Sequence, residues 1–153
     1  MKLSKKCEYA LRALTRLASP GAPSMMSIQE LAQQEHIPKK FLEQVLLALK
    51  KAGILQSSRG KTGGYSLSRP PAEVSLADIM QAVDGPLLLL PCLAVVAPKK
   101  CSDCVSLDHC WLRATMANVG TGIQKTLECL SLAEMSRRAA QSQRRNAAAM
   151  YHI

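Results

Sequence analysis

The sequence lacks the features that mark several large classes of protein. Its run of four leucines, Leu87–Leu90, is far too short to cross a bilayer, so we expect no membrane partner. Charged residues interrupt the apolar residues of the first nineteen positions, so we expect no signal peptide and a cytoplasmic protein. There are no internal repeats, no glycine-rich phosphate loop before a predicted helix and no nucleophile–base motif. We therefore do not expect an enzyme.

Acidic residues are few, and basic residues are unevenly distributed. The 153-residue chain has 20 Lys and Arg against 11 Asp and Glu, a formal net charge of +9. Residues 1–70 contain twelve basic and four acidic residues, whereas residues 71–136 contain four basic and seven acidic ones. Four arginines follow in the tail. This clustering favours a polyanionic partner for the first half of the chain over charges that merely solvate helices.

The stretch 27–65 organises the chain. Ser27 followed by Glu30 is a capping box, which predicts a short helix that stops near His36, just before Pro38. Pro38 suits the first position of a second helix, because its missing N–H has no partner there anyway. Apolar residues spaced by three and four predict the buried face of that helix: Phe41, Leu42, Val45, Leu46 and Leu49. Two short helices joined by a tight turn predict a helix-turn-helix.

A basic hairpin is expected to follow the second helix. Gly53 is placed to end the helix in a left-handed conformation. Ile54–Ser57 and Tyr65–Ser68 can then pair as strands around a glycine-rich loop that carries Arg59 and Lys61. A basic hairpin behind a helix-turn-helix is a wing. The sequence thus predicts a mainly α-helical fold with a small β-wing, which is a winged helix-turn-helix over residues 1–85.

The first helix is expected over Leu3–Ser19. Cys7 lies on its apolar stripe, which favours a small core residue over a metal ligand. Tyr9 lies near the basic residues of this helix, where it can either touch a DNA phosphate or pack against the helix-turn-helix.

The second half of the chain has a different pattern. Ser75 with Asp78 caps another short helix through Val83, and Leu87–Leu90 is either a buried extended segment or a lead-in to the next loop. Residues 86–110 form a cysteine-rich loop, and a long helix is expected to start near Ser106. Its apolar residues form a heptad-like seam: Leu112, Met116, Val119, Ile123, Leu127 and Leu130.

One helix cannot bury such a seam on itself. The better interpretation is a dimerisation helix of a homodimer, and the alternative is a seam that faces the first helix of the same chain. Residues 106–140 then contain the dimerisation helix and a last short helix that is capped by Ser131 and Glu134. Residues 141–153 are expected to form a flexible basic tail.

Four of the six cysteines fall within nineteen residues, as C-x8-C-x2-C-x5-C. They are Cys92, Cys101, Cys104 and Cys110, and we expect them to bind a metal group because thiolates are ligands for iron and zinc. An iron–sulfur cluster suits such a set best. A structural zinc site normally has two tight cysteine pairs, and thiol switching without a metal is the third possibility. Asp103, Asp108 and His109 lie inside the set and can replace a sulfur.

Three segments of the sequence resemble the Rrf2 family of bacterial winged-helix regulators. They are K-L-S-K-K-C-E-Y-A-L-R-A-L at the start, I-P-K-K-F-L-E-Q-V-L in the helix-turn-helix, and S-S-R-G-K-T-G-G-Y in the wing. That family includes an iron–sulfur-cluster assembly regulator, a nitric-oxide-sensing repressor and an iron-responsive repressor. The resemblance implies a homodimer with a long dimerisation helix and a cluster-binding loop before it.

The resemblance also implies roles for individual residues. It assigns Lys39, Lys40, Glu43 and Gln44 to the major groove of double-stranded DNA, and Arg59 to the minor groove. Glutamine can pair with adenine, glutamate can accept from cytosine, and arginine favours a narrow minor groove. Cys92, Cys104 and Cys110 resemble the three ligand cysteines of the family.

Two departures concern the fourth ligand. The family's assembly regulator has a ligand histidine three residues after its last cysteine, where this chain has Arg113, which cannot ligate. The loop is also longer and contains the extra Cys101, which is therefore our first choice. Glu8 is the alternative, because some members use a carboxylate from the partner's first helix. We expect a two-iron two-sulfur cluster in preference to a four-iron four-sulfur one.

These observations predict a dimeric DNA-binding regulator, a repressor, that senses iron or redox state through a cluster. The alternative is a zinc- or thiol-stabilised winged-helix interaction module without a cluster.

Overall fold

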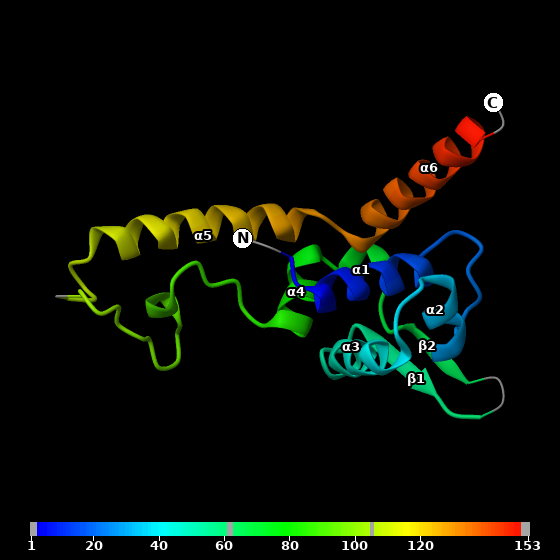
Figure 1. The fold of residues 1–153 in the computed structure, drawn as a ribbon, viewed down its shortest axis with the longest axis horizontal. Coiled ribbons are helices and arrows are strands. Elements are labelled where there is room, and N and C mark those ends of the chain that lie inside the picture. Colours follow the sequence, from blue (N-terminus) through cyan, green and yellow to red (C-terminus); the bar gives the residue numbers. More distant parts are fainter. Residues whose placement is uncertain (1–2, 61–62, 105, 151–153) are drawn as a thin grey trace.

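The computed structural model describes residues 3–60, 63–104 and 106–150 (Figure 1). Its elements, in chain order, are α1 (Lys5–Leu17), α2 (Ile28–Gln34), α3 (Lys39–Lys51), β1 (Leu55–Ser58), β2 (Gly64–Leu67), the 3-10 turn η1 (Pro71–Glu73), α4 (Leu76–Asp84), the 3-10 turn η2 (Pro91–Leu93), α5 (Trp111–Cys129) and α6 (Leu132–Met150). The expected mainly α-helical fold with a small two-stranded wing is confirmed. In the part of the chain that the structure describes, none of the helices is both long and apolar enough to span a membrane.

A compact body is built around α1. This helix packs against α3, α4 and α6, while α2 packs against α3 (Figure 1). The fully buried leucine and isoleucine side chains come from every part of the body: Leu14, Leu31, Leu42, Leu46, Leu49, Ile54, Ile79 and Leu132. The core therefore fixes α3 and the hairpin relative to α1 and α4.

Local sequence signals explain the short helices. Both expected capping boxes are present: Ser27 with Glu30 at the start of α2, and Ser75 with Asp78 at the start of α4. Gly53 ends α3 with φ +70°, a conformation that glycine adopts without a steric penalty. Pro38 differs by one position from the expectation. Its ψ of 125° is not helical, so it precedes α3 as the N-cap residue.

The wing is anchored at its base. β1 and β2 pair antiparallel, from Leu55 opposite Leu67 to Ser58 opposite Gly64. The segment before α2 extends this pairing, because Met26 and Tyr65 exchange two backbone hydrogen bonds of 3.0 and 2.8 Å. A Cβ atom on Gly64 would lie 2.5 Å from the Met26 carbonyl oxygen, so this close approach requires glycine.

The expected burial of Phe41 is wrong, because its side chain is 52% exposed. The apolar face of α3 is wider than the surface that packs on it, and Phe41 lies at its edge. Leu87–Leu90 is a lead-in to the loop rather than a buried strand. This segment has no regular structure, and Leu88 is 43% exposed.

Two expected helix boundaries are also wrong. The long helix begins at Trp111 rather than near Ser106, because Cys110 is extended (φ −85°, ψ 108°) and serves as the N-cap. The last helix is not short, since α6 runs to Met150 and includes part of the expected flexible tail. Alanines and arginines, which favour helix, fill much of that segment.

The long helix α5 extends away from the body and carries the cysteine loop at its far end (Figure 1). Two backbone hydrogen bonds fix its other end to the start of α4 and the residues just before it. The Leu76 N–H donates to the Leu130 carbonyl at 2.8 Å, and the Leu132 N–H donates to the Val74 carbonyl at 2.7 Å. Within this one chain, the apolar side of α5 packs on α4 and η2.

Candidate functional site

The first candidate surface is the outer side of α3. All four residues assigned there, Lys39, Lys40, Glu43 and Gln44, are exposed. Buried residues at 42, 45, 46 and 49 hold the opposite side in the core, so the polar side faces outward. The structure thus brings these four side chains onto one accessible surface, as a helix that enters a DNA groove requires.

The wing lies close to this helix. Lys50 donates a 2.6 Å hydrogen bond from Nζ to the Ser57 hydroxyl oxygen, which joins the end of α3 to β1. Arg59 is exposed at the tip of the wing, next to Gly60 with φ +114°. Lys61 lies outside the described residues.

Tyr9 packs against α3, which is one of the two roles that the sequence left open. Its ring meets Phe41 edge-on, with centroids 6.5 Å apart and planes at 67°. Lys5 Nζ lies 6.0 Å from the Tyr9 ring centroid. Tyr9 is only partly buried, so it lies at the edge of the α3 surface together with an exposed lysine.

An ion-pair group sets the position of α2 relative to α1. Arg16 Nε lies 2.8 Å from one Glu35 carboxylate oxygen, and Arg12 Nε lies 3.5 Å from the other. Arg12 also donates to the Glu35 backbone carbonyl, which is at the C-terminal end of α2. Positive side chains at a helix C-terminus interact favourably with its dipole.

The second candidate site is a cavity of about 330 Å³ at the start of α5. Cys92, Cys101, Cys104 and Cys110 all line it. Cys92 is buried, Cys101 is exposed, and the other two are half-buried. η2 supplies Cys92, the loop supplies Cys101 and Cys104, and the N-cap of α5 supplies Cys110. The structure therefore brings together the four cysteines that the spacing singled out.

The charge around the cavity is positive. Lys99, Lys100 and Arg113 also line it, and no carboxylate of the described residues does. Partial burial and the neighbouring Cys101 thiol raise the pKa of Cys104, while Lys100 opposes that rise. A group that bears several negative charges would relieve the excess of positive charge there.

The donors fit a thiolate-bound iron or zinc group in kind, and all four line one cavity. They do not form a closed ligand shell, since no three His, Cys, Asp or Glu side chains of the described residues are close enough together to hold a metal ion. Asp103, Asp108 and His109 do not line the cavity. The cysteines would have to draw together around the group.

Glu8 and the remaining cysteines lie elsewhere. Glu8 is on α1, 2.7 Å from Lys5 Nζ, and this lysine lowers the pKa of the Glu8 carboxyl. Cys7 is fully buried in the body, as its place on the α1 stripe predicted. Burial, together with the charge of Asp84, raises the pKa of Cys7 to about 11. Cys129 is exposed on α5. One chain thus places Glu8 outside the cysteine cavity.

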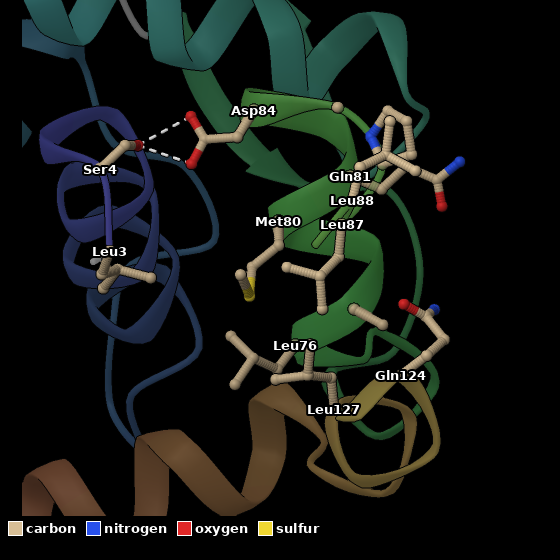
Figure 2. A pocket seen from close by; sticks show the side chains of 13 residues that line it. Leu3, Ser4, Leu76, Met80, Gln81, Asp84, Leu87, Leu88, Gln124 and Leu127 are labelled. Carbon is tan, nitrogen blue, oxygen red and sulfur yellow. Dashed lines mark hydrogen bonds between the residues drawn. The ribbon is translucent and has the colours of Figure 1, made fainter. Parts of the chain in front are cut away.

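Two features could not be found from sequence patterns. Arg113 contacts both ends of the cysteine loop, and the pairing of an arginine with main-chain carbonyls has no sequence signature. A larger cavity of about 700 Å³ lies between the start of α1, α4 and α5. Figure 2 shows Leu3 and Met80 on opposite sides of it, with Ser4 and Asp84 hydrogen-bonded at one end.

The seam of α5 is partly open. Leu112 is 40% exposed and Val119 is 45% exposed, whereas Leu127 contributes to the larger cavity beside α4. Trp111, at the start of α5, is 76% exposed. An apolar strip therefore remains uncovered along the part of α5 that leaves the body.

Comparisons with known proteins cover nearly the whole described chain. A family model described as Rrf2, iron-dependent transcriptional regulator, matches residues 3–138. An rrf2-like helix-turn-helix transcriptional regulator of Rhodobacter capsulatus is 38% identical over 136 residues, which is 87% of this chain and 91% of that protein. The structure of IscR from T. potens is 27% identical with a TM-score of 0.69, and covers 94% of this chain and 91% of that one. The structure of CymR, the global cysteine regulator of B. subtilis, is 23% identical with a TM-score of 0.69, and the match covers 90% of this chain and 98% of that one. At this identity the comparison shows likeness of fold alone.

Proposed function

The chain belongs to the Rrf2 family of winged-helix transcriptional regulators, and from this we propose that it is a homodimeric repressor controlled by an iron–sulfur cluster. It is a DNA-binding regulator rather than an enzyme, as its family and relatives are. The observation that carries the sensor proposal is the gathering of four cysteines and three cationic side chains around one cavity. The family description independently names iron dependence.

The proposed DNA contacts follow from the exposed side of α3. Lys39 and Lys40 stand in its first turn and meet phosphates beside the major groove, where Glu43 and Gln44 face base edges. Arg59 enters the adjacent minor groove, with Lys61 as a second basic residue of the wing. Tyr9, at the edge of this surface, is in position to contact a phosphate.

The proposed homodimer buries the open strip of α5. Two copies of the strip that contains Leu112 and Val119 would face each other across a two-fold axis, and each would cover the other. A two-fold dimer presents two copies of α3, which suits a two-fold operator.

The proposed cluster is held by Cys92, Cys104 and Cys110, with Cys101 as the fourth ligand and Glu8 of the second copy as the alternative. When bound, an iron–sulfur cluster supplies a redox-active group that responds to oxidants and iron supply. Lys99, Lys100 and Arg113 offset the negative charge that the thiolates bring into the cavity. We retain the two-iron form as the expectation. The proposal places the protein in the cytoplasm, where cysteines stay reduced.

The packing suggests how the two sites communicate. The cysteine loop is attached to α5, α5 packs on α4, and α4 packs on both α1 and α3. A change in the loop therefore reaches the DNA-reading helix through a continuous series of packed helices. Coupling between two such sites is typically worth about 1–3 kcal/mol.

A zinc-stabilised interaction module is the second candidate. It is favoured by the turn at Cys101 and Cys104, where the Cys104 N–H donates to the Cys101 carbonyl at 3.1 Å. Two cysteines separated by two residues are common in structural zinc sites.

The deciding experiment is anaerobic purification with absorbance spectroscopy and counts of iron, zinc and acid-labile sulfide. We expect a coloured protein with equal iron and sulfide, and two irons per ligand set. Operator binding is then compared between the loaded and cluster-free protein. Zinc without sulfide would establish the second candidate, and equal operator affinity of the two forms would remove the sensor role.

Single Cys→Ser variants assign the ligands. Substitution of Cys92, Cys104 or Cys110 should give colourless or rapidly bleaching protein. The same change at Cys7 or Cys129 should preserve the colour, which makes these variants matched controls. Cys101→Ser separates the two choices for the fourth ligand. Loss of colour supports Cys101, and a shifted but retained spectrum supports Glu8, which Glu8→Ala then tests.

A further inference from the structure

Arg113, in the first turn of α5, contacts both ends of the cysteine loop. Its Nε donates to the Cys92 carbonyl at 3.3 Å, and its Nη1 donates to the Leu107 carbonyl at 3.4 Å. Its backbone N–H donates to the Cys110 sulfur at 3.5 Å. One residue thus contacts an early part of the loop, a late part of it and the N-cap of the following helix.

These partners leave the charge of Arg113 uncompensated. The two side-chain partners are neutral carbonyls, and none of the ion pairs among the described residues includes Arg113. Arg113 also lines the cysteine cavity, and none of the described residues in its wall carries a carboxylate. Its guanidinium therefore joins the loop ends and directs a permanent positive charge toward the cysteines.

Among the described residues, the other hydrogen bonds of the loop are short-range. The Lys99 N–H donates to the Pro91 carbonyl at 3.3 Å, and the Cys104 N–H donates to the Cys101 carbonyl at 3.1 Å. Neither of them connects the segment around Cys92 to that around Leu107. Most residues between 94 and 104 are exposed, so little apolar burial holds the loop closed.

We propose that Arg113 is a latch that closes the cysteine loop in the cluster-free chain and adds a fixed positive charge to the cavity it closes. The closed loop keeps Cys92 beside the α5 N-terminus, so the cysteines already line one cavity and have only to draw closer together when a metal group arrives. The fixed charge stabilises a cluster that gains an electron, since added positive charge favours the more negative form. The charge effect rests on the proposed cluster, whereas the closure does not.

Closure can be tested by alkylation in the reduced, cluster-free protein. Iodoacetamide labelling of each cysteine is followed by mass spectrometry. In wild type, buried Cys92 should react slowly and exposed Cys101 quickly. In Arg113→Gln, labelling of Cys92 relative to Cys101 should become about tenfold faster, because hydrogen bonds from a charged donor are lost. Loss of a nearby positive charge would by itself slow the reaction of Cys92, because it disfavours the reactive thiolate. Faster labelling of Cys92 therefore reports opening of the loop.

The protein contains its own controls. Cys7 is fully buried in the body, so its continued protection shows that the variant is folded. Lys125→Gln removes an exposed positive charge from the same helix and should leave the Cys92 rate unchanged. Arg113→Lys, which keeps the charge but not the two-pronged contact, should open the loop partly. An unchanged Cys92 rate in Arg113→Gln overturns the latch. If Cys7 becomes reactive in Arg113→Gln, that variant is not properly folded. The Cys92 labelling rate in Arg113→Lys is then compared with wild type, and an unchanged rate overturns the latch.

The charge is tested separately, by spectroelectrochemistry of the reconstituted protein. The reduction potential should be more negative in Arg113→Gln than in wild type, and close to wild type in Arg113→Lys. Equal potentials in all three proteins overturn the electrostatic role. A wild-type protein that loads no cluster refutes the sensor proposal, while the alkylation result on closure stands.

Discussion

The Ser4 hydroxyl lies 2.6 and 2.7 Å from the two carboxylate oxygens of Asp84, a residue eighty positions further along the chain. Ser4 is also the N-cap of α1, because its oxygen accepts from the Cys7 N–H at 3.0 Å. Asp84 is the last residue of α4. One side chain thus caps α1 and ties it to the end of α4, from which the chain continues toward the cysteine loop (Figure 2).

Ser4→Ala should lower the free energy of unfolding by about 1–2 kcal/mol, because it removes the cap and the contact with Asp84 together. Urea unfolding followed by circular dichroism measures this change. Ser24→Ala, in an exposed loop, should change the free energy by less than about 0.5 kcal/mol. Equal stability of the Ser4 and Ser24 variants would show that the contact contributes nothing.

Stability should decline at high pH through Cys7. Burial raises the pKa of this thiol from 9.0 to about 11 in the folded chain. Between these values the unfolded chain holds fewer protons than the folded one, so raising the pH lowers the free energy of unfolding. The part of the free energy of unfolding that depends on the protonated Cys7 thiol is present in full below pH 9.0 and is lost by about pH 11.

Urea unfolding at pH 8.5 and 10.5 measures this decline. Cys7→Ala should lose less stability between the two pH values than wild type, whereas Cys129→Ala, at an exposed thiol, should behave like wild type. Equal losses in wild type and Cys7→Ala would rule out Cys7 as the cause.

Two substitutions separate base reading from phosphate binding. Arg59→Ala should weaken operator binding by about 1–3 kcal/mol if its guanidinium enters a groove. Lys39→Ala should weaken binding to all sequences and lower the slope of log affinity against log salt by about one. Fluorescence anisotropy at several salt concentrations measures both, with Lys125→Ala on α5 as the control. Wild-type affinity in both variants would refute the assignment of α3 and the wing to DNA.

Val119→Asp tests the dimer interface. Val119 is 45% exposed in the single chain, so an aspartate is tolerated there in a monomer but not in a buried seam. Light scattering should show a monomer, with loss of tight binding to a two-fold operator. Thr121→Asp, exposed on another side of α5, should remain dimeric. A dimeric Val119→Asp would exclude this strip as the interface.

Local patterns predicted those features that nearby residues determine. Ser27 with Glu30, and the left-handed Gly53, each act within a few residues of the chain, and the structure confirms both. The heptad-like spacing likewise identified α5 as one long helix. Grouping of the four cysteines was also predictable, since they are close in sequence.

The remaining features depend on contacts that spacing does not encode. Helical periodicity placed Phe41 on the buried face, but the extent of that face depends on neighbouring elements, and Phe41 lies beyond it. Cys110 as an N-cap was missed because a thiol is an unusual cap compared with Ser, Thr, Asp or Asn. The contacts of Arg113 with Cys92 and of Ser4 with Asp84 join residues 21 and 80 positions apart.

The nineteen residues of α5 make a rod about 28 Å long, at 1.5 Å per residue. The hydrogen bond from the Leu76 N–H to the Leu130 carbonyl fixes one end of this rod, and the cysteine loop is attached to the other. Rotation about the fixed end moves the loaded end by about 0.5 Å per degree, given that length. A tilt of a few degrees about the fixed end of α5 therefore moves the cysteine loop by about an ångström or more. If α5 tilts as a rigid rod, a shift of the cysteine loop becomes a much smaller shift where α5 meets α4.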